Sequence, residues 1–342
     1  MIVYSKQSGV NNAAYGKIET PIKMIIEHES DLLTRAGGIR DSLFNVEKSN
    51  RFGETIVGTN EFGVFAASAE GEAAESDTVS EVYSKFIEHI QFMKEFTVTA
   101  EMMEDAVVGI AADAKRRAEG FTRAYYKTMN KICECALMNG LSTSATFANA
   151  TLDLTTPDGE ALFSSAHSYG TDASGNQSNY FYGNIFGGSS ASTDAFEESL
   201  YELSVKLRNM RDESGEPLGY TADTIILPGN RPVAEAIAKK VCGSYGTSDN
   251  INLNFGAWRV IVLPGWQASD NRVMIMSSEA NKNLSGNMFY NRVPLTVTSW
   301  VDNHTGNYIW NGRCRFGVGF GSYKHILLAV DSASSVSGAT AL

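Results

Sequence analysis

The clearest pattern of apolar and polar positions runs from Thr99 to Asn139. Largely apolar side chains recur there at three- and four-residue spacing, which gathers them on one helix face: Met103, Val107, Ile110, Ala114, Phe121, Tyr125, Thr128 and Ile132. Thr99 is suited to cap the start of this helix, and Gly140 is suited to end it. At 1.5 Å per residue the helix would be about 60 Å long, far longer than the usual helix. We therefore predict a spine helix over 99–139.

Before the spine, two β-rich stretches at 54–67 and 79–99 flank a short acidic segment. The segment, SAEGEAAESD, consists of small and acidic residues, which is typical of a flexible turn. Alternation with a period of two in the second stretch predicts a long two-stranded hairpin. From Glu61 to Glu81 the chain has six acids and no Lys or Arg. An isolated hairpin is only marginally stable in water, so we expect this one to lie on a neighbour.

The first fifty residues lack a comparable pattern. A short helix is predicted after Pro21, followed by irregular or extended chain. Six basic and six acidic residues balance each other over this stretch. We interpret residues 1–50 as an arm that finds its partners outside the local core.

After the spine, the pattern alternates between polar loop and short regular elements. Residues 141–192 are predicted to be a polar loop, and a helix capped by Ser192 or Thr193 should follow. A buried strand should end at Pro228, and a short helix should begin near Pro232. Long β runs fill the C-terminal third, and the last residues, SASSVSGATAL, are predicted to be a frayed tail.

The amino-acid composition limits the classes of function that we expect for this protein. The 342 residues are 43% hydrophobic and 20% charged, which suits a core-forming protein. The net charge of −11 opposes nucleic-acid binding, because it repels phosphate. The start of the chain has no signal-peptide pattern, and the apolar runs are too short to span a membrane. Four scattered cysteines predict no disulfide framework, and Cys133 and Cys135 point to different sides of the spine, so they should not share a metal.

One stretch, DGEALFSSAHSYG, carries residue types found in catalytic sites. A hydrolase would use Ser165 as nucleophile and His167 as its base, but no G-x-S-x-G turn frames these residues. An ordered packing loop is the favoured interpretation. The glycine run at 317–321 lacks the helix that a phosphate loop needs, so it indicates close backbone packing in a strand. The five histidines show no metal-ligand spacing. We predict no catalytic, cofactor or metal site.

Taken in order, the elements resemble the major capsid proteins of tailed phages, which have the Hong Kong 97-type fold. The acidic-tipped hairpin that runs into the spine is similar to that family's E-loop and spine helix. A G-x-x-L-F-S-x-x-H stretch ending at His167, then D-x-x-G-x-P-L from Asp212, then an apolar strand ending at Pro228 resemble the Mu-like prophage head-subunit branch. The resemblance covers 54–228 by motif and the remainder by order of elements.

The resemblance implies an α+β fold with five parts. They are an N-terminal arm at 1–50, an E-loop hairpin at 51–98, a peripheral domain at 99–192 with the spine helix, an axial domain at 193–295, and return strands of the peripheral domain with a C-terminal tail at 296–342.

The resemblance also implies a structural role. The chain would be a non-enzymatic virion subunit, assembled in the host cytoplasm into hexamers and pentamers of an icosahedral phage head. That head would enclose double-stranded DNA without specific binding. A separate scaffold, a portal and decoration proteins are the implied partners; no membrane or cofactor is implied. The hairpin-tip acids Glu70, Glu72, Glu75 and Asp77 are the predicted inter-subunit contact. The alternatives are an encapsulin-like bacterial compartment shell and the Ser165/His167 hydrolase.

Overall fold

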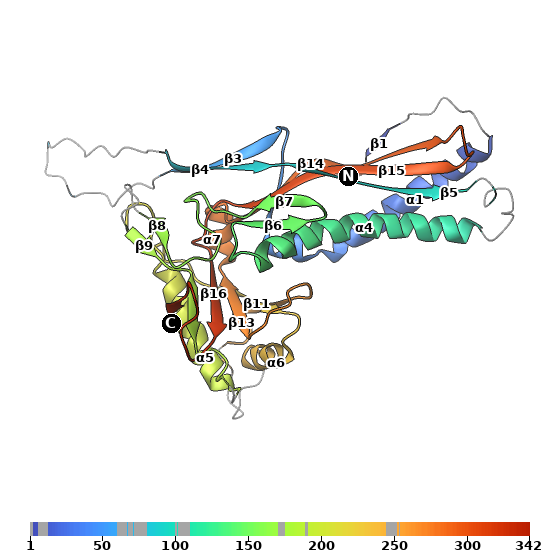
Figure 1. Ribbon diagram of the computed structural model, residues 1–342. Helices are drawn as coiled ribbons and strands as arrows, with labels where there is room; N and C mark the ends of the chain where they lie inside the picture. Colours follow the sequence, from blue (N-terminus) through green and yellow to red (C-terminus); the bar gives the residue numbers. More distant parts are fainter. Residues whose placement is uncertain are drawn as a thin grey trace.

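Two lobes, each built on its own sheet, make up the molecule (Figure 1). The computed structural model describes residues 3–5, 13–59, 67, 71, 81–99, 101, 110–169, 175–188, 191–243, 252 and 254–342. Within these residues, no helix combines the length and the apolar character needed to cross a membrane.

The first lobe is organised around two long antiparallel strands, β14 (Asn287–Val301) and β15 (Tyr308–Phe320). On one side β5 (Ile90–Val98) pairs antiparallel with β15. On the other side β1 (Val3–Ser5) and β2 (Asn45–Lys48) pair in parallel with different parts of β14. The result is a five-stranded sheet assembled from the two ends of the chain and the stretch before the spine.

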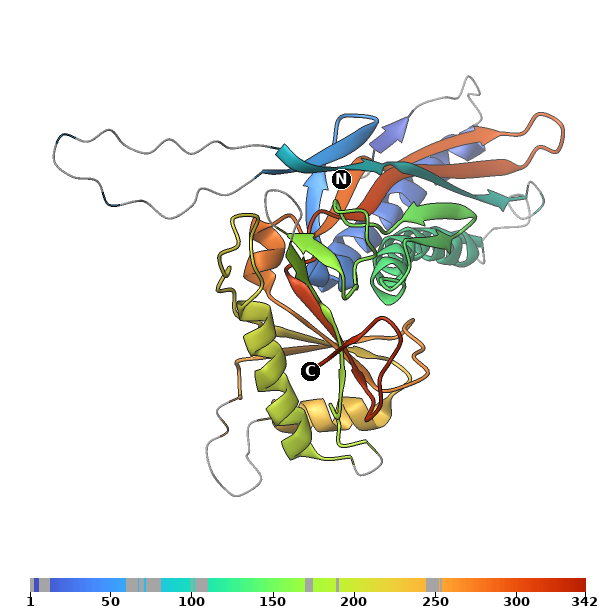
Figure 2. The same cartoon turned by 60° about the vertical axis from the view of Figure 1, so that its left-hand side comes forward.

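Two helices, α1 (Ala13–Ala36) and α4 (Ile110–Met138), lie along one face of this sheet (Figures 1 and 2). Ile22 and Ile26 of α1 are buried in a cluster with Phe121 of α4 and Trp310 of β15. The short helix α2 (Ile39–Leu43) follows, and its Leu43 is buried in the largest core cluster.

Two expectations for the first fifty residues are therefore wrong. The helix does not begin after Pro21, because α1 starts at Ala13 and continues through the proline. The described part of the segment also does not find its partners outside the local core. It packs against α4 and pairs with β14 of its own subunit.

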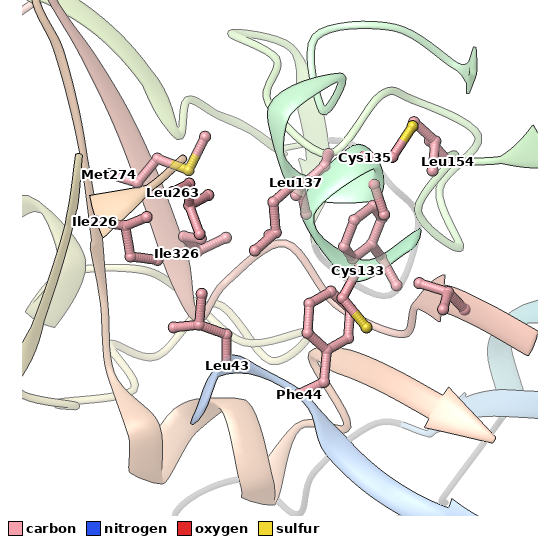
Figure 3. Close-up of a cluster of buried hydrophobic side chains, with 14 of the residues drawn as sticks. Leu43, Phe44, Cys133, Cys135, Leu137, Leu154, Ile226, Leu263, Met274 and Ile326 are labelled. Atoms are coloured by element: carbon pink, nitrogen blue, oxygen red, sulfur yellow. The ribbon is translucent and has the colours of Figure 1, made fainter. Parts of the chain in front are cut away.

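The spine helix ends near the predicted position. Helix α4 is 29 residues, about 44 Å at 1.5 Å per residue. Glu101 is helical, and residues 102–109 lie outside the described part, so the predicted start at Thr99 stays a prediction. At the other end, a Cβ on Gly140 would lie 2.7 Å from the Phe163 ring, which explains a glycine there. The last turns of α4 enter the core that joins the lobes, between Leu43, Phe44 and strands of the second sheet (Figure 3).

The predicted hairpin is confirmed at its base and corrected in its extent. Strands β3 (Gly53–Thr59) and β4 (Glu81–Glu88) pair antiparallel. The strand is interrupted at His89, and the chain continues as β5, which belongs to the five-stranded sheet and not to the hairpin. Strand β4 packs on the glycine run of β15, because a Cβ on Gly317 would lie 2.8 Å from the Glu88 carbonyl oxygen. Close backbone packing, as the sequence indicates, accounts for these strand glycines.

The second lobe is a six-stranded sheet with helices α5 (Thr193–Arg208) and α6 (Pro232–Val241) packed against it. Ser192 caps α5, as predicted, by accepting a hydrogen bond from the Ala195 amide. The strands, in sheet order, are β12 (Arg259–Leu263), β11 (Thr224–Pro228), β13 (Arg272–Met276), β16 (Ile326–Asp331), β10 (Tyr180–Gly183) and β17 (Thr340–Ala341).

This strand order corrects the assignment of the chain's last part. Strand β16 lies in the middle of the second sheet, so 296–342 does not belong wholly to the first lobe. The tail is not frayed either. Strand β17 pairs with β10, and the Leu342 amide donates to the Tyr182 carbonyl at 3.0 Å.

Much of the predicted polar loop at 141–192 is regular structure. It contains the hairpin of β6 (Ser144–Phe147) and β7 (Ala150–Asp153) and the hairpin of β8 (His167–Tyr169) and β9 (Gly175–Gln177). Leu152, Leu154 and Leu162 are buried. The helix α7 (Ser278–Asn283) completes the junction between the lobes.

Candidate functional site: the polar junction beneath the hairpin

The His167 side chain is fully buried. Its Nδ1 is 2.7 Å from Asp158 Oδ2, and its Nε2 donates to the Leu162 carbonyl oxygen at 3.2 Å. The Tyr323 ring stacks on the imidazole, with centroids 3.7 Å apart and an interplanar angle of 3°. Burial alone would raise the pKa of Asp158, but hydrogen bonds from His167, Thr156 and the Glu160 amide lower it below its usual value. The carboxylate is therefore held ionised beside the imidazole.

This geometry does not assemble the Ser165/His167 pair of a hydrolase. Both ring nitrogens of His167 already have partners, so neither is free to take a proton from a serine. No hydrogen bond joins Ser165 to His167, although both residues are described. Ser164 instead caps its own turn by accepting from the Ala166 amide at 3.2 Å. The stretch is built as a packing loop, which is the interpretation favoured from the sequence.

The base of the hairpin is fixed to this loop by polar side chains of β4. The Lys85 side chain is only 7% exposed, and its ammonium pairs with Asp153 and donates to Thr155. Burial would raise the pKa of Asp153, but its bonds to Lys85 and Thr155 lower it. Two residues earlier, the Tyr83 hydroxyl lies 3.5 Å from the Ser168 carbonyl oxygen. The angle at which the hairpin leaves the body is thus set by directional contacts.

A cavity of about 210 Å³ lies under the hairpin base, lined by residues of the first and second lobes. On its far wall, the Lys324 ammonium and the Glu213 carboxylate form a largely buried ion pair. Tyr323 is held by its hydroxyl, which donates to the Ser168 carbonyl at 3.0 Å and accepts from Gln177 at 2.7 Å. Burial raises the pKa of Tyr323, so the hydroxyl stays protonated. Tyr323 and Lys324 are thus held by neighbouring groups, which suits an interlock between elements, whereas Glu213 Oε2 is buried with no hydrogen-bond partner among the described residues.

A second buried polar group ties the N-terminal segment to both lobes. His325 Nε2 donates to Asn287 Oδ1 at 2.9 Å. The amides of Asn281 and Asn287 both donate to the Leu43 carbonyl oxygen. Burial lowers the pKa of His325 to about 3, so the ring is neutral in the folded protein. We call His325, Asn281 and Asn287 the histidine hub.

The described residues form neither a metal-binding site nor a reactive thiol site. No group of three or more His, Cys, Asp or Glu side chains there is arranged to hold a metal ion. The four cysteines are free thiols. Burial raises the pKa of Cys242 to about 11 and that of Cys314 to about 12. Such thiols are protonated and unreactive near neutral pH.

The predicted contact residues Glu70, Glu72, Glu75 and Asp77 lie outside the described residues, so their role stays a prediction. The sequence pointed to His167 but not to its partners. Asp158 is nine residues away and within the same quoted stretch, so its spacing was a usable signal. Lys85 and Asp153 are 68 residues apart, and no local pattern relates them.

Comparison with known proteins places the fold. No family model matches the chain. No curated protein matches it either. Among solved structures, a virus-like particle from Pyrococcus furiosus superposes with a TM-score of 0.51 at 10% identity, covering 91% of this chain and 98% of that one. The capsid of Myoviridae phage XM1 superposes with a TM-score of 0.51 at 16% identity, covering 86% and 92%. The predicted α+β, Hong Kong 97-type capsid fold is confirmed.

Proposed function

We propose that this protein is the structural subunit of a tailed-phage head, in the Mu-like branch of the capsid family. The observation that carries the proposal is the extent of the structural match, which spans nearly all of this chain and of a protein that forms virus-like particles. The match covers 91% of this chain, so nearly all of it takes part in the shared fold. Identical copies would close into pentamers and hexamers of an icosahedral shell that encloses double-stranded DNA. The acidic surface, with a net charge of −11, suits containment without DNA binding.

Assembly would use the hairpin. Its base is rigidly fixed through Lys85, while strands β3 and β4 lead away from the body (Figure 1). A two-stranded ribbon needs a further surface for stability. We propose that the segment with Glu70, Glu72, Glu75 and Asp77 finds that surface on a neighbouring subunit. A separate scaffold and a portal would act in the host cytoplasm with this chain.

Sedimentation velocity and negative-stain imaging of the purified protein test this function. The expected result is closed particles of megadalton size, formed alone or on co-expression with the neighbouring head genes. Deleting Ser68–Asp77 should leave the subunit soluble and folded but reduce particle yield. A protein that stays monomeric across salt, concentration and co-expression conditions would overturn the proposal.

Two further measurements separate the alternatives. The contents of purified shells distinguish a DNA container from an encapsulin-like compartment, which would hold protein cargo. Replacement of His167 by Ala tests the hydrolase alternative, since that alternative requires an esterase or peptidase activity that the wild type has and the variant lacks. We expect His167→Ala to lower subunit stability and shell yield, because it removes the partner of Asp158.

A further inference from the structure

The solvent-facing side of the spine helix α4 is basic, although the chain as a whole is acidic. Helix α4 contains six basic and three acidic residues, whereas the whole chain has a net charge of −11. Arg116, Arg123, Lys127 and Lys131 are all exposed. At 3.6 residues per turn they fall within one sector of about 80° and extend over about 22 Å of the helix. We call these four residues the basic stripe.

The described part of the subunit neutralises this stripe only in part. Helices α1 and α4 form the outer layer on one face of the five-stranded sheet (Figure 2). Glu29 of α1 pairs with Arg123, with Nε and Oε1 2.6 Å apart, and Glu119 lies 3.5 Å from the same guanidinium. Lys127 and Lys131 form no ion pair with any residue that the structure describes. The half of the stripe nearer the end of α4 therefore carries positive charge that awaits a partner.

The acids elsewhere in the subunit do not cancel this local charge. Helix α1 exposes Glu27 and Asp31 beside the layer, but it also exposes Arg35. At physiological ionic strength, charges are largely screened from each other beyond about 8 Å. A polyanion that lies along α4 therefore interacts mainly with the basic side chains directly beneath it.

We propose that the basic stripe faces the interior of the shell and contacts the phosphate backbone of the enclosed double-stranded DNA. This inference rests on the proposed function and adds which side of the subunit is turned toward the DNA. Lysines and arginines clustered along one helix are the electrostatic footprint of a phosphate contact. Contacts to phosphate carry no sequence information, so the interaction should not depend on the DNA sequence.

The charge of the whole subunit limits the strength of this contact. With a net charge of −11, the remaining surface repels phosphate, so a free subunit should hold DNA weakly and only at low salt. Inside a shell, enclosure keeps the DNA at high concentration against the wall, which favours a weak contact by mass action. The stripe would then line the wall where the DNA lies closest.

Charge reversal in the stripe tests the contact. The stripe variant is Lys127→Glu/Lys131→Glu. The control variant, Lys240→Glu/Lys282→Glu, makes the same change of charge at two exposed lysines of α6 and α7. Fluorescence anisotropy of a labelled DNA duplex reports binding by unassembled subunits at low salt. We expect the stripe variant to bind about tenfold more weakly than the wild type, with a salt slope shallower by about two, and the control to stay within about threefold.

Circular dichroism melts show whether both variants fold. If the stripe variant does not fold, Lys127→Gln/Lys131→Gln replaces it. Equal weakening by the stripe variant and the control would mean that only the total charge matters, and would overturn the proposal. A wild type that binds no duplex at low salt would overturn it as well.

Lysine acetylation of particles tests which side of the subunit faces the DNA. DNA-filled and empty particles are treated with a small acetylating reagent, and mass spectrometry measures the labelled fraction of each lysine. Relative to the other exposed lysines, Lys127 and Lys131 should be labelled several-fold less in filled particles than in empty ones, because the DNA covers them. Equal labelling in both kinds of particle would place the stripe away from the DNA and would contradict the proposal.

An acidic protein segment is the competing occupant, and polyglutamate is its probe. If polyglutamate binds the wild type more tightly than the duplex does at equal charge concentration, the stripe receives an acidic protein and the proposal fails. The failure of the proposed function looks different. In that case the wild type would form no particles, while the duplex titration would still compare the stripe variant with the control.

Discussion

The two faces of the five-stranded sheet have opposite chemistry although they share the same strands. Toward α1 and α4, the face presents Leu295, Val297 and Trp310, which are buried with Ile22 and Ile26. Toward the hairpin, the same strands present arginines that form no ion pair with any described residue, together with buried polar atoms for which the described residues supply no hydrogen-bond partner. One face is covered by helices of the same subunit, whereas the other carries charged side chains. Stability and assembly should therefore respond to different substitutions.

The largest expected effect is on the helix-covered face. Trp310 is 1% exposed and stacks on Phe96 with centroids 6.1 Å apart. Trp310→Ala should lower the free energy of unfolding by about 3–5 kcal/mol, because it leaves a large cavity. Denaturant titration of unassembled subunits measures this. Arg313→Ala on the opposite face is the matched control, and a comparable loss there would break the contrast between the faces.

The pH dependence of the free energy of unfolding should distinguish two buried histidines, His325 and His89. Burial lowers the pKa of His325 in the histidine hub to about 3, whereas an unfolded histidine titrates near 6.5. As the pH falls below 6.5, the unfolded chain binds a proton that the folded chain refuses, so stability is lost. Between pH 7 and pH 5 the loss should be roughly 2 kcal/mol. Unfolding titrations at both pH values check it.

His325→Gln should remove most of that pH dependence. His89 belongs to the hairpin side, and its pKa is also lowered by burial, although the Phe52 carbonyl and Glu54 act in the opposite direction. His89→Gln should therefore flatten the pH dependence less than His325→Gln does. If His89→Gln instead flattened the pH dependence more than His325→Gln, the histidine hub would be accessible to solvent.

Lys85→Met tests the attachment of the hairpin. The variant keeps the apolar stem but loses the pairing with Asp153, whose side chain is 60% exposed and can return to water. We expect a loss of about 1–2 kcal/mol, less than for a fully buried pair. Faster amide exchange confined to β3 and β4 should accompany it. Lys94→Met, which changes an exposed lysine of β5, should leave both quantities unchanged.

The smallest expected effect concerns Arg292 and Arg315 in isolated subunits. Arg292→Met/Arg315→Met removes two guanidinium groups that form no ion pair within the described part of the chain. The free energy of unfolding should therefore change by no more than about 1 kcal/mol, the contribution of the hydrogen bond from Arg315 to the His89 carbonyl. Thermal unfolding of unassembled protein measures this. A loss of several kcal/mol would mean that both faces of the sheet contribute comparably to the stability of the subunit.

Elements set by local periodicity were predictable from sequence. The apolar stripe through Phe121, Tyr125 and Ile132 identified the spine, and Ser192 identified the start of α5. Pro21 misled the prediction of α1, because proline usually marks a helix start, whereas here tertiary packing of Ile22 and Ile26 holds the helix through it.

The sequence alone could not show which strands pair with one another. Period-two alternation predicted that 90–98 is a strand, but it could not show that the strand pairs with β15 more than two hundred residues later. The same limit applies to the junction. No local pattern predicts the bulge in β14, next to which Val293 pairs with Arg315. The role of the glycine run at 317–321 could be predicted, because several glycines within one strand indicate close backbone approach.

A cryo-electron microscopy reconstruction of assembled particles tests the central claim most directly. We expect a closed shell built from pentamers and hexamers of this chain, in which the body of each subunit has the two-lobed fold described above. A protein that forms no closed particles, or particles whose subunits have another fold, would contradict the account.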